Sequence, residues 1–318
     1  MTVPAPTFPV SPADIVAAHE RITAHVRRTP VLDVDAATLG VPVALKLELL
    51  QHTGSFKPRG AFNRALTADV PAAGLIAASG GNHGLAVAHV ATRLGLRAEI
   101  FVPEASPAVK VDRLRSFGPH VAVTVTGALY ADAHEASMRR AAETGALVVH
   151  PYDQPEVLAG QGTTARELDE QVPGIDTVLV AVGGGGLAAG VACWFAGRVR
   201  VVAVEPERSC ALAAAMAAGG PVDVDVSGVA SDSLGARRVG ELAYAAAVAG
   251  IDRVVTVADA DIVATQRRLW DEVRLVVEAG GAAAAAAVLS GAYVPEPDER
   301  VAVVVCGANT DPASVAKG

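Results

Sequence analysis

The chain is built around Thr53-Gly54-Ser55-Phe56-Lys57-Pro58-Arg59-Gly60-Ala61-Phe62, with Lys57 in the middle. Lys57 follows a Gly-Ser turn and precedes Pro58, which suits the first turn of a helix because its φ is fixed and it has no N–H to lose. An ammonium at the positive end of a helix should lose its proton more easily than a free lysine. A neutral amine of this kind suits a nucleophile that forms a Schiff base. The alternative is a surface lysine ahead of a helix.

Lysine is rare in this sequence, with four lysines against 22 arginines, so general surface charge comes from arginine. Three of the four are expected in ordinary settings. Lys46 alternates with leucines in a strand pattern, Lys110 lies on a polar helix face, and Lys317 is next to the last residue. Lys57 is the lysine whose sequence surroundings indicate a reactive amine.

Composition limits the class of protein. A length of 318 residues allows one large domain or two smaller ones, and 51% hydrophobic residues with 4% aromatics predict a core of Ala, Val and Leu. The net charge of −8 and the pI of about 5.5 argue against nucleic acid or an anionic membrane as a partner.

Cysteine and histidine usage indicates a compartment and argues against a metal centre. Cys193, Cys210 and Cys306 are far apart and lack Cys-x-x-Cys spacing, which fits the reducing cytoplasm. No basic region followed by an apolar run opens the chain, so no signal peptide is expected, and no apolar stretch is long enough to span a membrane. The eight histidines show no metal-ligand spacing, so no metal site is predicted.

Strand and helix patterns alternate along most of the chain, which predicts an α/β fold with open, mostly parallel sheets flanked by helices. A helix at 12–26, capped by Ser11, and a strand at 41–47 come first. Residues 152–162 read as an irregular crossing between two series, and 223–234 as an irregular loop near the site. The first series has strands at 75–78, 98–102, 121–125 and 146–150, with helices at 85–94, 107–117 and 128–144. The second has helices at 163–172, 187–195, 211–218, 259–274 and 280–289, with strands at 177–182, 200–204, 253–257 and 301–305.

Three loops follow strands at the edge where ligands of such sheets bind. The turn Gly183-Gly184-Gly185-Gly186 lets backbone N–H groups converge on a phosphate, although it also suits a tight strand–helix turn. The turn 79–84 suits a carboxylate, and Asn82 suits a phenolate oxygen, although Ser79 or Asn82 also suits an ordinary helix cap. Cys306 ends a core strand, so it is either a buried small hydrophobe or a weak partner for a ring nitrogen.

A dinucleotide site is the competing hypothesis. Gly183, Gly185 and Ala188 satisfy G-x-G-x-x-A, and Glu205 ends the next strand, as a ribose-binding acid would. An NAD-dependent dehydrogenase is therefore an alternative, as is a non-catalytic module that binds a ligand. Against the dehydrogenase, an α/β segment of comparable size precedes this motif, and the motif leaves the Lys57 and Asn82 segments unexplained.

Taken together, the motifs closely resemble those of fold-type II pyridoxal phosphate enzymes, with the serine/threonine dehydratase and serine racemase branch the nearest. The resemblance runs from about residue 12 to 312, and several motifs occur in the right order. They are Leu45-Lys46-Leu47-Glu48 with the Lys57 segment, Ser79-Gly80-Gly81-Asn82-His83-Gly84, His150-Pro151-Tyr152, Gly160-Gln161-Gly162-Thr163, Val182-Gly183-Gly184-Gly185-Gly186-Leu187 and Val204-Glu205-Pro206.

The resemblance implies a large cofactor-binding domain (1–73 and 151–318) and a small domain (74–150) that grips substrate. It implies that pyridoxal 5'-phosphate forms a Schiff base with Lys57, which later removes the Cα proton. The remaining implied roles are a ring contact by Phe56, a hydrogen bond from Asn82 to the ring's 3-oxygen, phosphate binding by Gly183, Gly184, Gly185, Gly186 and Leu187, a neutral partner for the ring nitrogen in Cys306, and a grip on the substrate carboxylate by Ser79, Gly80, Gly81, Asn82 and His83.

The implied reaction is β-elimination of water from L-threonine or L-serine, which gives a 2-oxo acid and ammonia; the implied assembly is a homodimer. Departures from the family pattern keep alternatives open. Gly80 stands where the racemases carry a serine as second base, so racemization should be weak or absent. Ala211 stands where metal-activated members carry a carboxylate. Asp232-Ser233 replaces the usual Asp-Gly, so a larger 3-hydroxy amino acid is a possible substrate. No C-terminal regulatory domain is expected after Gly318.

Overall fold

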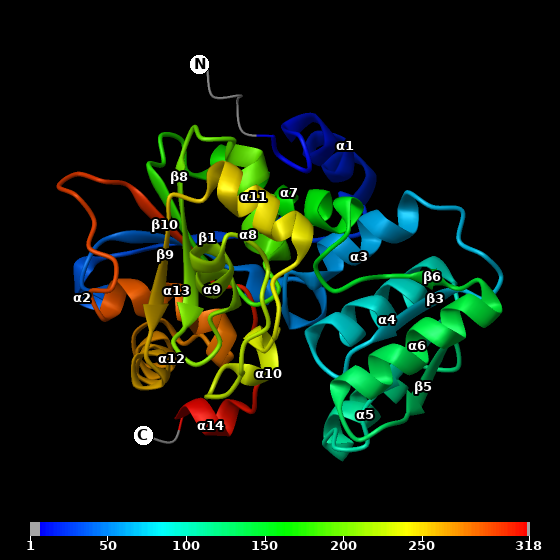
Figure 1. The fold of residues 1–318 in the computed structure, drawn as a ribbon. Helices are drawn as coiled ribbons and strands as arrows, with labels where there is room; N and C mark the ends of the chain where they lie inside the picture. Colours follow the sequence, from blue (N-terminus) through cyan, green and yellow to red (C-terminus); the bar gives the residue numbers. More distant parts are fainter. Residues whose placement is uncertain (1–6, 317–318) are drawn as a thin grey trace.

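The computed structural model describes residues 7–316, so Lys317 lies outside the described residues. Two β-sheets organise the chain, and they lie side by side in Figure 1. All pairings are parallel except that of β1 with β2. The larger sheet has the order β1 (Val31–Val34), β2 (Val43–Lys46), β10 (Val301–Val304), β7 (Thr177–Ala181), β8 (Arg200–Pro206), β9 (Arg253–Val257); the smaller has the order β5 (Val121–Val125), β4 (Ala98–Val102), β3 (Leu75–Ala78), β6 (Leu147–Val148). The predicted α/β class with two mostly parallel sheets is confirmed.

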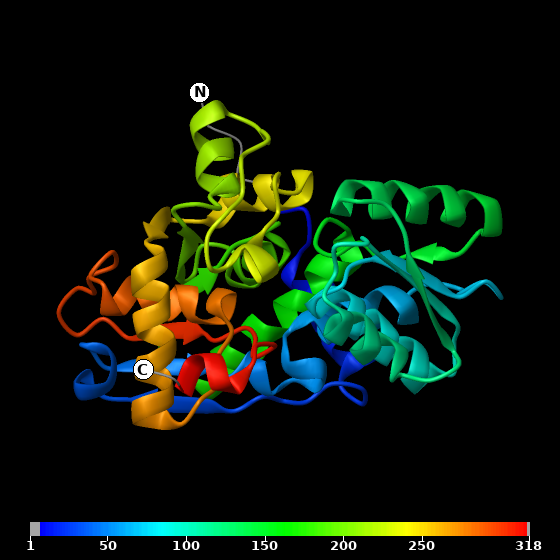
Figure 2. The same ribbon diagram turned by 90° about the horizontal axis from the view of Figure 1, so that it is seen from below.

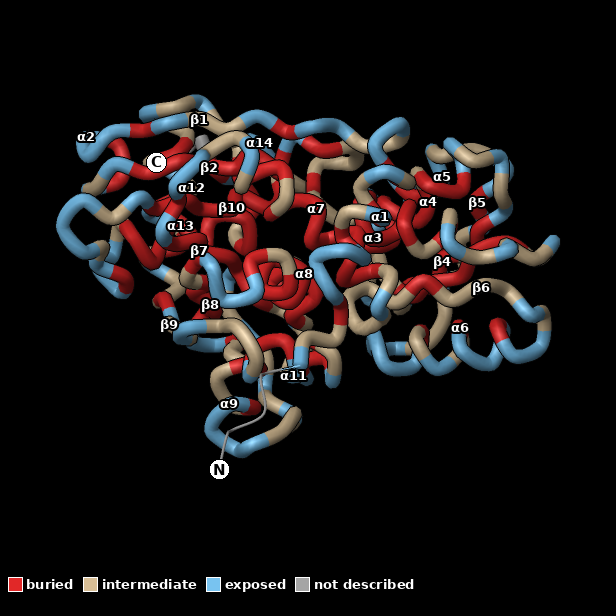
Figure 3. The backbone as a smooth tube through the Cα atoms, turned by 90° about the horizontal axis from the view of Figure 1, so that it is seen from above, coloured by how far each residue is buried: buried red, intermediate tan, exposed pale blue. Residues whose placement is uncertain are grey.

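Helices cover both faces of the larger sheet. Helix α8 (Gly186–Phe195) packs on β7 and β8 beside α7 (Pro155–Gln171) and α11 (Glu241–Gly250), and α13 (Ala279–Leu289) packs on β7 to β10 beneath α12 (Asp259–Val273). Figure 2 shows α12 and α14 together at one side of this sheet, and Figure 3 shows the buried backbone of β7, β8, β10 and α8 at the centre. The other helices here are α1 (Pro12–Ile22), α2 (Ala36–Leu39), α3 (Lys57–Leu66), α9 (Ala211–Ala218), α10 (Ser231–Leu234) and α14 (Pro312–Ala316), with two 3-10 turns at Glu48–Leu50 and His52–Gly54.

The smaller sheet carries α4 (Asn82–Leu94), α5 (Ala108–Arg115) and α6 (Tyr130–Thr144). Its main core is a separate cluster of buried side chains, which includes residues of α3 such as Phe62. Helix α3 therefore packs against α4 on one side and α7 on the other, and it links the two sheets. No helix in the described part of the chain is long and apolar enough to cross a membrane.

The predicted irregular crossing at 152–162 is wrong over most of its length, because α7 begins at Pro155. Pro155 occupies the first turn, where proline is tolerated. Gly160 and Gly162 lie inside this helix, where each permits close helix packing. A Cβ on Gly160 would lie 2.6 Å from the Arg59 carbonyl oxygen, and one on Gly162 would lie 2.9 Å from the Gly190 carbonyl oxygen.

Other predicted elements match to within a few residues at their ends, but β1, α11 and the short helices α2, α10 and α14 were not predicted. The edge strand β1 pairs antiparallel with β2, so it does not belong to a β-α-β unit. Helix α11 is an alanine-rich segment that packs on α8. The stretch 223–234 is irregular as predicted except for the short helix α10, whose Leu234 is buried.

Lys46 corrects the expectation of an ordinary strand lysine, because its side chain is fully buried. Its Nζ forms an ion pair with Glu167 on α7 at 2.7 Å. Arg59, also fully buried, donates to both oxygens of Glu167 and both oxygens of Glu48 at 2.8 Å. The two cations and two carboxylates balance, so this buried quartet joins β2, α3 and α7 without a net charge.

Candidate functional site

Lys57 is the first residue of α3, as predicted, and it borders a cavity beside the larger sheet. Its side chain is only partly buried because it faces the cavity, but protein surrounds the amine. The Nζ donates a hydrogen bond to the Pro151 carbonyl at 2.6 Å and lies 5.0 Å from the centre of the Phe56 ring. Desolvation lowers the Lys57 pKa to about 8, against the opposing influence of Cys306 and Glu278. Burial, rather than the helix end, is therefore the main cause of the expected shift.

The glycine turn lies in the same cavity, between β7 and α8. Gly185 has a φ of 92° and caps α8, a conformation that side chains disfavour. A Cβ on Gly184 would lie 2.2 Å from the Tyr152 ring, and one on Gly186 would lie 2.7 Å from the Tyr152 carbonyl oxygen. The packing thus requires bare backbone at the N-terminus of a ten-residue helix, which suits a phosphate.

Phe56, Leu187 and Cys306 also line this cavity, as the sequence predicted. Cys306 is 4% exposed, and burial raises its thiol pKa to about 12, so the thiol is neutral. Its Sγ lies 3.6 Å from the Gly280 carbonyl oxygen. A neutral, weak hydrogen-bonding group is therefore available to a ring nitrogen.

Asn82 joins the two sheets at the cavity. It begins α4 next to β3, yet its Nδ2 donates to Glu278 Oε1 at 2.6 Å, and its Oδ1 accepts from Asn309 Nδ2 at 2.6 Å. Asn309 Nδ2 also donates to the Thr53 carbonyl at 2.8 Å. These contacts fix the amide orientation of Asn82, whose Nδ2 carries a second hydrogen for a ring oxygen.

A second cavity adjoins the first and shares Asn82 and Glu278 with it. Gly80 and Gly81 line it together with Leu85, Lys110, Arg113, Asp232 and Asn309. The predicted members Ser79 and His83 contribute no side chain to either cavity. The Ser79 hydroxyl accepts from the Gly81 N–H at 3.2 Å, and His83 Nε2 contacts the Val149 carbonyl at 2.8 Å. Burial lowers the His83 pKa to about 3, so this imidazole is neutral.

Sequence reasoning gave no role at the site to Tyr152, which packs against the glycine turn, or to Glu278, which lines the first cavity. Ser233, in the loop expected near the site, also lines the first cavity. A local signal existed for Glu278, an acid between an apolar run and the Ala-Gly-Gly start of a helix. No local signal indicated that Asn309 would reach Asn82.

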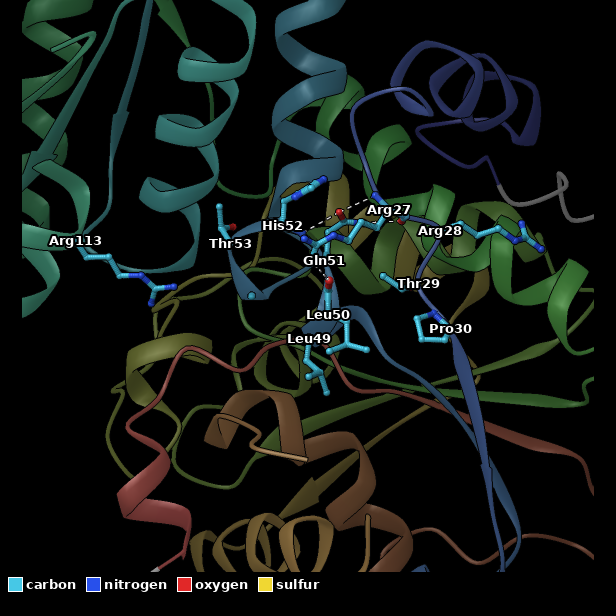
Figure 4. Close-up of a pocket in the computed structure, with 11 residues that line it drawn as sticks. Arg27, Arg28, Thr29, Pro30, Leu49, Leu50, Gln51, His52, Thr53 and Arg113 are labelled. Carbon is cyan, nitrogen blue, oxygen red and sulfur yellow. Dashed lines mark hydrogen bonds between the residues drawn. The ribbon is translucent and has the colours of Figure 1, made fainter. Parts of the chain in front are cut away.

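A hollow larger than either of these two cavities lies beside the 52–54 turn. Figure 4 shows Arg27 and Arg28 on one side of it and Arg113, from the smaller sheet, on the other. It contains neither Lys57 nor the glycine turn. Size alone would therefore misplace the site, and we locate it at the cavity where the chemically distinctive groups meet.

The Glu205 carboxylate binds the backbone of helix α9 rather than facing a ligand site. Its two oxygens accept from the N–H groups of Leu212 and Ala213, both at 2.8 Å, and its side chain is fully buried. It is therefore not placed as the ribose-binding acid of a dinucleotide site. Among the described residues, no cluster of three or more His, Cys, Asp or Glu could hold a metal ion.

A buried amine with a lowered pKa, in one cavity with a glycine turn at a helix N-terminus, fits a phosphorylated aldehyde cofactor. The family model "Pyridoxal-phosphate dependent enzyme" matches residues 22–307. The chain belongs to this family, in the branch of threonine dehydratases and serine racemases, and its cofactor is pyridoxal phosphate.

Relatives and solved structures agree on this assignment. The chain is 36% identical over 304 residues to phenylserine dehydratase of Ralstonia pickettii, covering 93% of this chain and 92% of that one. It is 39% identical over 282 residues to the biosynthetic L-threonine dehydratase of Burkholderia multivorans, covering 86% of this chain but only 56% of that one. The structure of maize serine racemase superposes with a TM-score of 0.90 at 32% identity and covers 97% of this chain and 96% of that one.

Proposed function

We propose that this protein is an ammonia-lyase that eliminates water from L-threonine or L-serine to give a 2-oxo acid and ammonia. The observation that carries the proposal is the Lys57 amine, set inside the protein between the glycine turn and a neutral Cys306. Two relatives are named for dehydration of 3-hydroxy amino acids, phenylserine and threonine, which supports the same reaction class here.

The residues that line the cavity fit the cofactor, and each would have its own role. The backbone of Gly183, Gly184, Gly185 and Gly186, with Leu187, would hold the phosphate, and Phe56 would lie against the ring. Asn82 would donate to the ring's 3-oxygen. Bound pyridoxal phosphate supplies the electron sink for the pair left at Cα. Lys57 would hold the cofactor covalently and then accept the Cα proton.

The turn at 79–83 would bind the substrate carboxylate. Only Gly80, Gly81 and Asn82 border the cavities, so Ser79 and His83 would act through their backbone or by supporting the turn. Residues 74–150 would form the small substrate-gripping domain, and the remaining residues, 1–73 and 151–318, the large one.

Two features favour elimination over other reactions of this cofactor. A neutral Cys306 leaves the ring nitrogen without a proton, and the weaker electron sink favours loss of a β-substituent over transamination. Gly80 offers no side chain as a second base for racemization; a Cβ there would lie 3.4 Å from the Ser106 hydroxyl oxygen.

We also propose that the enzyme is a cytoplasmic homodimer.

The proposal is tested by the release of ammonia and 2-oxo acid from a panel of 3-hydroxy amino acids. We expect turnover of threonine or serine, with the recovered substrate unchanged in chirality. Faster turnover of phenylserine or 3-hydroxyaspartate would move the specificity to a larger substrate. Serine and threonine are both in the panel because discrimination by one methyl group is worth only about 1–3 kcal/mol. Conversion of L-serine to D-serine without ammonia would replace the lyase by a racemase.

Attachment of the cofactor to cofactor-free protein should depend on pH through the Lys57 amine. Only the neutral amine attacks an aldehyde, and the Lys57 pKa is about 8 rather than 10.5. The attachment rate should therefore rise about tenfold per pH unit below pH 8 and level off above it. Stopped-flow absorbance measures the rate, with free lysine as the control. A rate that keeps rising to pH 10 would show that the amine is not desolvated.

A further inference from the structure

Glu278 is a buried carboxylate at the site, and the mechanism above leaves it without a role. It follows the apolar run 275–277 and precedes α13, and the residue is 6% exposed. Its Oε1 accepts from Asn82 Nδ2 at 2.6 Å. No arginine, lysine or histidine in the described residues forms an ion pair with it, and its side chain does not cap α13.

The Glu278 carboxyl group is closely packed, and its charged form is unfavourable. A Cβ on Gly307 would lie 1.8 Å from Glu278 Oε1, so a side chain at 307 would displace the carboxyl group from this position. A carboxylate buried without a cation is unfavourable, and it responds by holding its proton more tightly. Burial raises the Glu278 pKa to about 7, so near neutral pH the group can both give and accept a proton.

Glu278 also stands where the two cavities meet. The first holds Lys57 and the glycine turn, the second is lined by Gly80 and Gly81, and Glu278 lines both. An amino acid that reaches from the cofactor beside Lys57 to the 80–81 turn must therefore pass this carboxyl group. The hydroxyl that leaves from its β-carbon needs a proton, because hydroxide is a poor leaving group.

We propose that Glu278 donates the proton that turns the departing β-hydroxyl into water. The inference rests on the proposed function, since it concerns the second half of the same elimination. Lys57 accepts the Cα proton, the electron pair left at Cα forms the C=C bond, and the C–O pair leaves with oxygen and takes the Glu278 proton. One proton transfer from Lys57 back to Glu278, directly or through water, restores both groups.

The charged groups around Glu278 are consistent with this cycle. Lys110 lowers its pKa and Asp232 raises it, and both belong to the second cavity. Glu278 in turn raises the pKa of Lys57 and of Cys306. A purely positional role, in which Glu278 only orients Asn82, is the alternative that an experiment must exclude.

Glu278→Gln separates the two roles, because glutamine can still accept the hydrogen bond from Asn82 but has no acidic proton. We compare initial rates of ammonia release from L-serine and from 3-chloroalanine, whose chloride leaves without protonation. We expect the serine rate to fall about 100-fold or more, while the chloroalanine rate falls less than about tenfold. Glu278→Asp, which keeps an acid, should recover part of the serine rate.

Two further measurements make the result decisive. The absorbance of bound cofactor should be unchanged in Glu278→Gln. Two carboxyls, those of Glu205 and Glu278, are expected to titrate near pH 7 in the infrared spectrum of the cofactor-free protein, and one of the two should disappear. Glu205→Gln is the matched control, because Glu205 is also buried with a pKa raised to about 7 but lies outside both cavities. It should leave the ratio of the two rates unchanged.

Equal losses with both substrates would overturn the proton-donor role in favour of positioning, and an unchanged serine rate would overturn both roles. These outcomes differ from failure of the proposed function. That failure would appear as a wild-type protein that binds the cofactor but releases no ammonia from any 3-hydroxy amino acid, and it would overturn the Glu278 role as well.

Discussion

Lys57→Ala is expected to abolish the covalent bond to the cofactor and to lower ammonia release by at least about 10³-fold. The Lys57 amine is the one expected both to hold the aldehyde and to accept the Cα proton, so one substitution removes two functions. Borohydride reduction followed by peptide mapping measures the first effect, because wild-type protein should carry the reduced cofactor on the peptide that contains Lys57. Steady-state assays measure the second effect.

Two controls separate chemistry from folding. Lys57→Arg keeps a long cationic side chain at the start of α3 but cannot form the covalent bond, so it should be as inactive as the alanine variant. Both variants should keep the glycine turn and retain measurable affinity for the cofactor, which fluorescence titration reports. A reduced cofactor found on Lys46 or Lys110 in wild-type protein would contradict the assignment.

The parts of the fold that the sequence predicted well are those with local causes. The strands of the smaller sheet have local patterns: 75–78 is a short apolar run after Gly74, and 98–102 is a mostly apolar run before Pro103. The start of α7 was missed because Gly160 and Gly162 act through tertiary contacts. Their small size is required by α3 and α8, and nothing within α7 indicates that.

The same division applies to the site. Lys57 and the 183–186 turn are recognisable because each needs its residue types consecutively, as a helix start or as bare backbone. Glu278 and Asn309 meet Asn82 only when the two sheets come together, and more than 190 residues separate Glu278 from Asn82. Pairing across such a separation depends on topology, which single-residue patterns do not encode.

The burial of Lys46 is the feature that the sequence predicted least well. The ion pairs around it lead to the second prediction, which concerns stability. A lysine between leucines in a strand resembles an outward-facing charge, but its Nζ is buried against Glu167. Arg59, two residues after Lys57, supplies the second cation of the quartet and also donates to Thr163 at 3.1 Å. The helix that begins at Lys57 is therefore held in place by ion pairs that water does not reach.

Arg59→Ala is expected to destabilise the protein by about 3–5 kcal/mol, because Glu48 and Glu167 would be left buried with only Lys46 between them. The midpoint and slope of denaturant unfolding, monitored with cofactor-free protein, measure the change. Arg139→Ala is the matched control, since its ion pair with Glu135 is exposed on α6 and should be worth about 0.3–0.5 kcal/mol.

A double substitution tests whether the loss of stability comes from an unpaired buried carboxylate. Arg59→Met combined with Glu167→Gln removes one charge of each sign, so it should be more stable than Arg59→Met alone, even though it changes more of the core. If the double variant were instead the less stable of the two, the cost would come from lost packing rather than from an unpaired buried carboxylate. Cofactor affinity should follow the same order as stability, because α3 positions Lys57 through the contacts of Arg59.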